Sequence, residues 1–349
     1  MLLQKDEESN AYDPQKSPFI ILLGLVGGVR LAKAVHVAVQ LGIPDLVDTT
    51  PISAKELAEL TGSHERSLYR LLRAIASIGI FKEVEPTQFV ATELSLYLRK
   101  DYPNTVRYMV MMMFTDSDWE AWERLDYSVR TGHSAFEHVH GTDSWTYLTS
   151  HPEEYEIFNR AMTSISDTTN ASIINAYDFS TIHTLADIGG GHGKVLATIL
   201  QAHPSMQGIL FDLAPVADTA RDVIAEAGLE ERCQVIGGSF FDEIPTGADA
   251  YLLKHVLHDW DDAACKKILD ACHSAMPAGT KLLIAEQVLP LTDIPVSVAS
   301  TDLSMLVGPG GCERTEQEYH TLLEASGFKI IKVHPTHALH CVVEAVAVA

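Results

Sequence analysis

The chain of 349 residues lacks the cysteine pattern of a disulfide-bonded or zinc-binding protein. Its five cysteines are an odd number at wide spacings, and no two of them form a C-x-x-C pair. A disulfide framework and a zinc module are therefore not expected. The default for such a chain is a reducing compartment, and we predict a cytoplasmic protein.

Basic residues are also scarce. Lys and Arg total 25 against 47 Asp and Glu, which gives a net charge of -22. A nucleic-acid partner requires a cationic surface, so the chain is not expected to bind DNA or RNA. Hydrophobic residues make up 46% of the chain, enough for a large core, and this excludes an extended disordered protein.

Long apolar runs are missing as well. The run Phe19–Val26 is far shorter than the roughly 18 to 20 residues that span a bilayer. Asp6, Glu7 and Glu8 precede it, where a secretory signal would be basic. We therefore expect a helix that packs on another surface, with no membrane partner. Internal repeats and low-complexity segments are not visible.

The length predicts two domains, at a prior of about 150 residues each. Residues 17–48 repeat apolar side chains near a period of 3.6, which predicts a helix. Ser53 stands three residues before Glu56, a capping box at the start of the next helix. A further helix and a small hairpin at residues 84–91 complete a winged-helix pattern. We assign residues 1–105 to this mostly helical domain.

A winged helix suggests DNA binding, so that alternative has to be weighed. Residues 51–100 are nearly balanced in acidic and basic side chains, whereas a DNA-binding module shows a clustered basic face. A scaffold or dimerisation role is therefore favoured. A winged-helix regulator with a small-molecule domain is the non-enzymatic alternative, and a gel shift at low salt would test it.

The rest of the chain, residues 106–349, begins with a helical segment at 106–178 and then alternates strands with helices. The predicted strands are 184–188, 208–213, 233–236, 248–253, 281–286, 328–333 and 341–348. The predicted helices between them are 194–203, 215–228, 262–277 and 316–326. This alternation predicts an α/β fold with a mostly parallel, Rossmann-like sheet covered on both faces.

A glycine-rich segment, residues 187–193 (DIGGGHG), follows the first of these strands and begins a helix. Glycines permit a tight turn there and let a ligand lie against bare backbone. Asp212 stands near the end of the next strand, where a carboxylate can accept hydrogen bonds from both ribose hydroxyls. We predict a ribose-bearing ligand; a tight turn without a ligand is the alternative for this segment alone.

Neither phosphate-binding motif is complete. A dinucleotide fingerprint needs a third glycine where the chain has Lys194. A P-loop needs a glycine and a hydroxyl residue where the chain has Ile188 and Val195. S-adenosylmethionine carries no phosphate and needs neither motif, so it is the favoured ligand.

Two further segments at this edge of the sheet carry chemistry. In residues 238–241 (GSFF), an aromatic face can cover adenine and a polar side chain can meet its edge. Lys254 can neutralise a carboxylate, and His258 is a candidate general base because imidazole titrates near neutral pH. A hydrogen-bonded core histidine is the alternative for His258 taken by itself.

Together these segments resemble the S-adenosylmethionine-dependent O-methyltransferases of the plant caffeic acid type. Bacterial and fungal natural-product enzymes and the animal hydroxyindole O-methyltransferase belong to the same group. The resemblance covers nearly the whole chain. Besides the winged-helix start, its motifs are LADIGGGHG at 185–193, FDLAPV at 211–216, GSFF at 238–241, LLKHVLHDWDD at 252–262, AEQVLP at 285–290 and GPGGCERTEQEY at 308–319.

The resemblance implies a seven-stranded methyltransferase sheet and a role for each cofactor-binding position. The predicted cofactor-binding residues are Asp187, Gly189, Gly191, Asp212, Ser239, Phe240 and Lys254. The glycine turn would line the methionine part of the cofactor, Asp212 would hold its ribose, and Lys254 would close the site. The family usually has Asp where this chain has Ser239, so we expect a weaker or water-mediated contact with adenine.

The resemblance also implies the catalytic residues. His258 would be the general base, with Glu286 and Glu313 flanking and orienting it. The predicted substrate-binding residues are Met162, Met305 and Asp259. The two methionines would clamp an aromatic acceptor. Asp259 follows the base and can orient it, although a helix cap is an equally good account of that residue.

The activity so implied is methyl transfer from S-adenosylmethionine to a hydroxyl of a small aromatic natural product, in a homodimer formed through the N-terminal domain. A cofactor-bound hydroxylase and an N- or C-methyltransferase are the enzymatic alternatives, but a base with two carboxylates favours oxygen. Several apolar side chains suit either core packing or an acceptor pocket: Met109, Met111, Met112, Met113, Phe114, Trp119, Trp122, Phe136 and Trp145.

Two histidine pairs raise the question of a metal. His138 and His140 stand close together, as do His337 and His340, but neither pair has further ligands at suitable spacing. The methyl transfer of this family needs no metal. No metal site is expected.

Overall fold

The computed structural model describes residues 17–336 and 340–349, without the side chains of residues 165–168. It divides into two compact units, Met1–Phe114 and Thr115–Ala349, and each is described by itself. The described residues do not include the three acidic residues that argue against a secretory signal, Asp6, Glu7 and Glu8. The same holds for His337.

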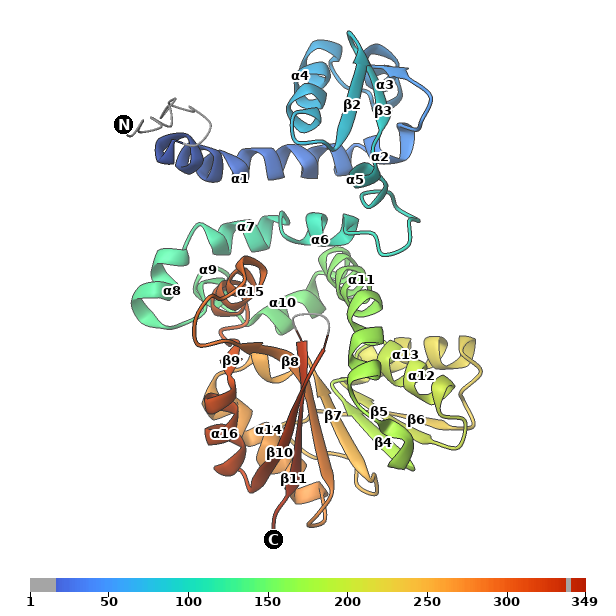
Figure 1. Ribbon diagram of the computed structural model, residues 1–349, viewed down its shortest axis with the longest axis vertical. Coiled ribbons are helices and arrows are strands. Elements are labelled where there is room, and N and C mark those ends of the chain that lie inside the picture. Colours follow the sequence, from blue (N-terminus) through green and yellow to red (C-terminus); the bar gives the residue numbers. More distant parts are fainter. Residues whose placement is uncertain (1–16, 337–339) are drawn as a thin grey trace, which may run out of the picture. The chain divides into compact units, whose positions relative to one another are not determined.

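The first unit is mostly helical, as predicted. Its elements are α1 (Pro18–Gln40), α2 (Ile43–Leu46), β1 (Ile52–Ser53), α3 (Ala54–Thr61), α4 (Glu65–Ala76), β2 (Phe81–Glu85), β3 (Gln88–Ala91), α5 (Glu93–Leu96) and α6 (Arg107–Met112). The strands pair antiparallel in the order β1-β3-β2, beside α3 and α4 (Figure 1). The helix–helix–hairpin pattern of a winged helix is therefore confirmed.

The start of α3 is fixed by the predicted capping box. The Ser53 hydroxyl accepts from the Glu56 N–H at 3.1 Å, and the Glu56 carboxylate accepts from the Ser53 N–H at 3.0 Å. Each bond satisfies a backbone donor that the helix itself leaves unpaired. Leu57 and Leu72 then bury their side chains completely against Phe81, which forms the core of this unit.

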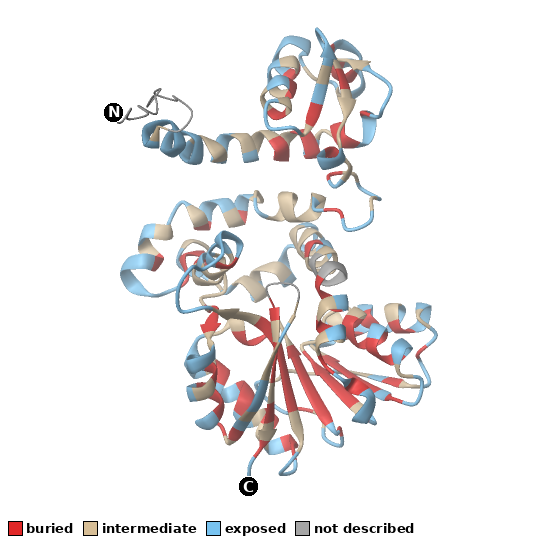
Figure 2. Ribbon diagram, viewed as in Figure 1, coloured by how far each residue is buried: buried red, intermediate tan, exposed pale blue. Residues whose placement is uncertain are grey.

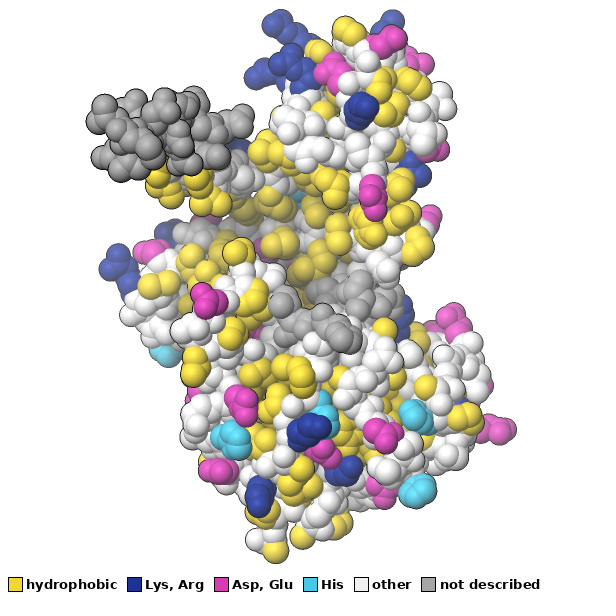
Figure 3. Space-filling view, in the orientation of Figure 1, with side chains coloured by type: hydrophobic (Ala, Val, Ile, Leu, Met, Phe, Trp, Pro, Cys, Tyr) yellow, Lys and Arg dark blue, Asp and Glu magenta, His cyan; other side chains and the backbone are white. Residues whose placement is uncertain are grey.

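Helix α1 is long, apolar and exposed over its first half. The exposed apolar residues are Phe19, Ile20, Ile21, Leu22, Leu23, Leu25, Val26 and Val29. Only the other end of the helix, including Ala38 and Val39, packs into the unit (Figure 2). By length and composition, α1 is the one helix in the described part of the chain that could cross a membrane. The expected helix is confirmed, and its apolar side chains are exposed within the part of the chain that the structure describes (Figure 3).

The second unit begins with five helices that precede its sheet. They are α7 (Asp116–Trp122), α8 (Leu125–Thr131), α9 (Ala135–His140), α10 (Ser144–Ser150) and α11 (Pro152–Ala176). Side-chain caps at Thr115, Ser134 and Asp143 start α7, α9 and α10. These short, capped helices form a layer, and the long α11 leads from it to the sheet (Figure 1).

The sheet has the predicted seven strands and one short addition. The strands are β4 (Thr184–Ile188), β5 (Gln207–Asp212), β6 (Cys233–Gly237), β7 (Ala250–Lys254), β8 (Lys281–Leu289), β10 (Phe328–Pro335) and β11 (His340–Ala347). Their order is β10-β11-β8-β7-β4-β5-β6, and the two-residue β9 (Arg314–Thr315) pairs with β8. Strand β11 runs antiparallel to both of its neighbours, β10 and β8, and the remaining pairs described for this sheet are parallel.

Helices cover both faces of this sheet. One face packs on α14 (Asp262–Ala275) and α16 (Glu316–Glu324) through a core that includes Tyr251, Ile268 and Leu323. The other packs on α11, α12 (Lys194–Ala202) and α13 (Ala214–Glu226). The four central strands are accordingly buried on both sides (Figure 2). This is the arrangement that near-continuous apolar strands require.

The strand connections bring the predicted site to one edge. Strands β4, β5, β7 and β8 are parallel, so their carboxyl ends meet at the same edge of the sheet. The antiparallel β11 begins there. Open α/β sheets bind ligands at this edge. The 3-10 turn η3 (Leu257–Asp259) and α15 (Val296–Val307) follow β7 and β8.

Candidate active site

The glycine turn after β4 presents bare backbone. Gly189, Gly191 and Gly193 have φ angles of 71°, 56° and 78°, which residues with a Cβ rarely adopt. A Cβ at Gly193 would lie 2.4 Å from Leu210, and one at Gly189 would lie 2.8 Å from Val256. Nothing lies within 4 Å of a Cβ at Gly191. The turn is thus tightly packed beneath Gly189 and Gly193, and open at Gly191.

Asp212, at the end of β5, is tied to this turn. Its Oδ2 accepts from the Gly191 N–H at 2.8 Å, and its Oδ1 accepts from the Leu213 N–H at 2.7 Å. Burial raises the pKa of Asp212, while these two hydrogen bonds counteract the rise. Each carboxylate oxygen keeps a further lone pair, so the group can accept from the two hydroxyls of a ribose.

Asp187 and Lys254 place opposite charges close to the turn. Asp187 is 1% exposed, and its Oδ2 has no hydrogen-bond partner within the described residues. Burial raises the pKa of Asp187 to about 7, against the influence of the Lys254 charge. Burial lowers the pKa of Lys254 to about 8, again opposed by its neighbour. An unpaired buried carboxylate oxygen and an ammonium suit the ammonium and carboxylate groups of methionine.

Ser239 and Phe240 follow β6 beside the same turn. The Phe240 ring lies 3.7 Å from the position of a Cβ on Gly189, and it packs edge-on against Trp260. The Ser239 hydroxyl accepts from the Phe241 N–H at 3.2 Å. Both side chains are half-buried. An aromatic face and a polar group therefore lie where a nucleobase would follow the ribose. Together with Asp187 and Asp212, they fit S-adenosylmethionine.

His258 lies in the turn η3 after β7 with a carboxylate on each side. Its Nδ1 is 2.9 Å from Oε1 of Glu313, and its Nε2 is 3.5 Å from Oδ1 of Asp259. The Glu313 side chain is fully buried. Because a carboxylate only accepts hydrogen bonds, Glu313 keeps the proton on Nδ1. Nε2 of the neutral ring then presents the lone pair that a general base needs.

These carboxylates also set the charge of the imidazole. Burial lowers the pKa of His258, but the charge of Asp259, the hydrogen bond that His258 donates to Glu313 and the charge of Glu286 outweigh it and raise the pKa to about 9. Burial raises the pKa of Asp259 to about 7. The helix cap at the start of α14 is Asp261 and not Asp259. Asp259 lies beside the imidazole, and its predicted roles in orienting the ring and in substrate binding stay predictions.

Glu286 does not reach the imidazole that it was expected to flank. Its Oε1 accepts from the N–H groups of Val256 and Leu257 at 3.0 and 2.7 Å, and its Oε2 accepts from the Tyr319 hydroxyl. Glu286 is completely buried. It holds the backbone that leads into His258, and its charge acts on the imidazole without a hydrogen bond to the ring.

Arg314 is a supporting residue that the sequence did not indicate. Its guanidinium donates to the Leu257 carbonyl at 2.9 Å, to the Trp260 carbonyl at 2.8 Å and to Asp262 at 2.8 and 3.0 Å. It is 1% exposed, whereas an arginine next to a glutamate and a threonine is typical of a surface. Arg314 clamps the turn from outside and satisfies two buried carbonyls.

Gly311, also missed, lies directly on the turn. A Cβ there would be 2.1 Å from the His258 carbonyl oxygen and 2.5 Å from the Trp260 nitrogen. The loop that carries Glu313 can approach the turn only because residue 311 has no side chain. The Glu313 N–H donates to Asp302 on α15 at 2.8 Å, which fixes the other end of this loop.

The predicted acceptor residues come from separate helices. Met162 lies on α11 and Met305 on α15, and both are half-buried. Trp145 on α10 packs edge-on against Phe158 of α11 with ring centroids 5.6 Å apart. Residues 109–114, also considered for the pocket, belong to the first unit. The apolar candidates of the second unit lie on α7, α9, α10, α11 and α15.

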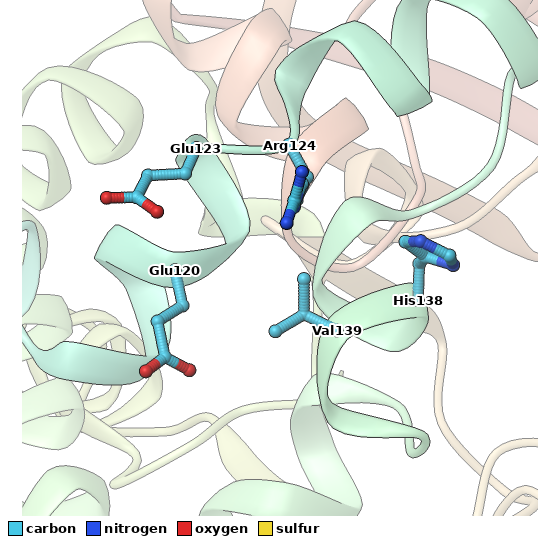
Figure 4. Close-up of a pocket in the computed structure, with 5 residues that line it drawn as sticks. All are labelled: Glu120, Glu123, Arg124, His138 and Val139. Carbon is cyan, nitrogen blue, oxygen red and sulfur yellow. The ribbon is translucent and has the colours of Figure 1, made fainter.

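A separate hollow of about 440 Å³ lies between the end of α7 and α9 (Figure 4). Its lining residues are Glu120, Glu123, Arg124, His138 and Val139. His138 stacks on Tyr127 at 3.9 Å and is engaged there. None of the predicted site residues lines this hollow. Within residues 17–336 and 340–349, no three His, Cys, Asp or Glu side chains form a group suited to a metal ion.

Comparisons with known proteins cover nearly the whole chain. Residues 122–329 match the family model of the O-methyltransferase domain, and residues 23–101 match that of the O-methyltransferase dimerisation domain. A phenazine O-methyltransferase of Lysobacter antibioticus is 43% identical over 325 residues, which are 93% of this chain and 95% of that protein.

Two solved structures are similar along their full length. The mitomycin 7-O-methyltransferase MmcR gives a TM-score of 0.90 at 40% identity, over 94% of this chain and 97% of that one. The second is an O-methyltransferase from neocarzinostatin biosynthesis in complex with S-adenosylmethionine and 2-hydroxy-5-methyl naphthoic acid. It gives a TM-score of 0.80 at 32% identity, over 91% of this chain and 96% of that one.

Proposed function

The chain belongs to the family of S-adenosylmethionine-dependent O-methyltransferases, and from that premise we propose that His258 is the general base for methylation of a phenolic hydroxyl on a small aromatic natural product. The single observation that carries the base assignment is the position of His258 Nδ1, 2.9 Å from the fully buried Glu313 carboxylate. This hydrogen bond leaves Nε2 as the proton acceptor.

The acceptor class is inferred from relatives and from the residues at the sheet edge. Relatives are named as a phenazine O-methyltransferase, a 6-O-methyltransferase of mitomycin biosynthesis and a 3-amino-4-hydroxybenzoate 4-O-methyltransferase. Met162, Met305 and Trp145 supply adaptable and flat apolar surfaces, which suit an aromatic ring. We assign to this chain an acceptor of the same class, an aromatic ring that carries a free hydroxyl.

The bound cofactor supplies the methyl group on a positively charged sulfur. The chain would hold it in the open space at Gly191, through the Asp212 carboxylate, and through the Asp187 and Lys254 charges. A phenol has a pKa of about 10 and is mostly protonated at neutral pH. His258 Nε2 takes this proton as the oxygen bonds to the methyl carbon, whose bond to sulfur breaks and leaves a neutral thioether. A positioned base contributes about 10²- to 10⁴-fold to such a step.

The pKa of His258 fixes the direction of the pH dependence. Only the neutral imidazole accepts a proton, and the surrounding carboxylates raise its pKa to about 9. Turnover should therefore increase as the pH rises through the pKa of His258. A cation bound nearby lowers that pKa, because it disfavours the imidazolium.

The test is a His258→Gln variant assayed with labelled cofactor on a panel of phenols. We expect unchanged cofactor binding by calorimetry and a loss of turnover of about 100-fold or more. His334→Gln is the matched control, since His334 pairs with Glu344 away from the turn. Wild-type turnover in the His258 variant would contradict the base assignment. An N-methyl product from aminophenols would favour the alternative of nitrogen transfer.

We further propose a homodimer formed through the N-terminal domain, in the cytoplasm. Two observations support this assembly: the match to a dimerisation domain, and the exposed apolar residues of α1. A second copy is expected to cover that helix, and not a lipid bilayer. All five cysteines are unpaired, which is consistent with a reducing compartment. Sedimentation equilibrium without detergent should give twice the chain mass; a monomer at micromolar concentration would contradict the proposal.

A further inference from the structure

Two histidine rings that the methyl transfer does not use meet beside Lys254. His255 has a φ angle of 53°, which is uncommon for a residue with a side chain. Its Nε2 lies 2.7 Å from Nε2 of His340, the first residue of β11. His340 is 6% exposed. Two ring nitrogens at this distance share one proton, so one ring donates and the other accepts.

Lys254 decides which ring donates. Its ammonium lies 3.4 Å from Nδ1 of His255, and an ammonium can only donate. Nδ1 of His255 is therefore the acceptor, and its Nε2 carries the proton that is donated to His340. His340 then carries its own proton on Nδ1. Burial lowers the pKa of both rings, that of His340 to about 4, so both are neutral at pH 7.

This order leaves a buried donor unused. Nδ1 of His340 has no hydrogen-bond partner among the residues that the structure describes. Gln287 stands directly opposite His340 on β8, and its Oε1 is also buried without a partner there. Directly opposed residues in an antiparallel pair lie on the same face. Leaving two such polar groups without a partner is costly, so a polar ligand group here is favoured.

The two residues lie within reach of the base. The rings of His258 and His255 are 5.2 Å apart at an angle of 24°, and those of His255 and His340 are 4.8 Å apart. The three rings follow one another along the edge where β7 and β8 end and β11 begins. One ring, that of His255, separates the His258 ring from the His340 ring, a spacing that suits an acceptor with two fused rings.

We propose that the Nδ1–H of His340 is a subsite for a carbonyl or carboxylate oxygen that the acceptor carries away from its methylated hydroxyl. The inference rests on the proposed function. An oxygen of this kind is favoured because the free group on His340 is a donor. A series of hydrogen bonds runs from the Lys254 ammonium through His255 to Nε2 of His340, and it polarises the Nδ1–H of His340. Gln287 completes the subsite, because rotation of its amide brings the NH2 group, a donor, to the second oxygen of a carboxylate.

Two variants of His340 separate the subsite from the contact with His255. The His340→Gln amide lies near the former Nε2, keeps an acceptor for His255 and has no group at the Nδ1 position. The His340→Asn amide lies near the former Nδ1 and keeps a donor there. His334→Gln on β10 is the matched control, because its partner is Glu344.

The assay compares phenols in pairs, for example a hydroxynaphthoic acid and the naphthol without its carboxyl group. We expect the wild-type, His340→Asn and His334→Gln proteins to favour the acid about 10-fold or more in kcat/KM, as a hydrogen bond to a charged group allows. In His340→Gln this ratio should fall to about 1. Each ratio is measured within one variant, so a partial loss of folded protein cancels.

A ratio of 1 in the wild-type protein, or a preference that persists in His340→Gln, would overturn the subsite. Methyl transfer to no phenol of either kind would instead contradict the proposed function. A measurement on the unaltered protein gives independent support. The ring ¹⁵N signals of His340 should shift when the acid binds and not when the naphthol binds, and unchanged signals with the acid would also overturn the subsite.

Discussion

The turn after β4 and the turn after β7 lie at the same sheet edge but are built in opposite ways. The first presents bare backbone, with left-handed glycines and open space at Gly191. The second is held by buried charged side chains, among them Glu286, Glu313 and Arg314. One turn makes room for a molecule, and the other fixes the position of a side chain.

The difference follows from what each turn has to do. A ligand can approach backbone closely only where Cβ atoms are absent, so the first turn depends on glycine. A general base has to be held in one orientation and in one tautomer. A hydrogen bond in which the donor or the acceptor is charged is stronger than one between neutral groups, and it therefore suits that task. Changes in the first turn should affect affinity, and changes in the second should affect rate.

The largest expected effect comes from Gly311→Ala. The new methyl group would lie 2.1 Å from the His258 carbonyl oxygen, and that neighbour is rigid backbone. The loop or the base must move, and a shift of about 1 Å costs on the order of 100-fold in turnover. Steady-state kinetics should show this loss in kcat, with cofactor affinity by calorimetry retained. A variant with wild-type kcat would contradict the tight fit of the loop on the turn.

Glu313→Gln should reduce kcat on the order of 10-fold to 100-fold, as part of the contribution of the base. It should also change the pH profile. The Glu313 side chain raises the pKa of His258, so its removal lowers that pKa. The neutral imidazole then persists at lower pH, and the rising limb of kcat against pH moves to lower pH. A limb that moves upward or stays in place would show that Glu313 does not act on the charge of His258.

Gly191→Ala changes the turn after β4, and it should affect cofactor affinity rather than kcat. Its φ angle of 56° costs an L-residue roughly 1–2 kcal/mol, and the methyl group enters the open space. Cofactor affinity should fall about 10-fold, while kcat at saturating cofactor stays close to wild type. A large loss of kcat with unchanged cofactor affinity would contradict the assignment of affinity to the turn after β4 and of rate to the turn after β7.

The smallest effect is expected from Ser239→Asp, which restores the residue usual at this position. A carboxylate accepts a stronger hydrogen bond than a hydroxyl does, so cofactor affinity should rise about 5-fold. The Phe241 N–H that now donates to Ser239 can donate to the aspartate as well. Ser239→Ala is the control and should bind the cofactor slightly more weakly than wild type. If the Ser239→Asp variant bound the cofactor more weakly than wild type, the prediction that residue 239 contacts adenine would be contradicted.

Much of the fold could be predicted because the information is local. The strands 184–188 and 281–286 were found from apolar runs, and the structure has them at Thr184–Ile188 and Lys281–Leu289. The Ser53 capping box was predicted from a spacing of three residues and is present. Apolar periodicity and helix caps depend on neighbours in the chain, so one sequence is sufficient to reveal them.

The supports of the base could not be predicted because they depend on distant pairing. Arg314 meets the Leu257 carbonyl only after β9 pairs with β8, and no local pattern marks it as buried. Glu286 was recognised, but its partners are backbone N–H groups and not the imidazole. The contact of His255 with His340 likewise requires β11 to pair with β8.

The supports of the imidazole also bear on how enzymes of this kind diversify. In the described structure, the side chains that hold the backbone of residues 256–260 and the His258 ring belong to residues between 259 and 314. None comes from helices α7 to α11. Substitutions in those helices therefore remove none of the side chains that hold the His258 ring. The surface offered to an aromatic acceptor and the support of the His258 ring are therefore encoded by different parts of the chain.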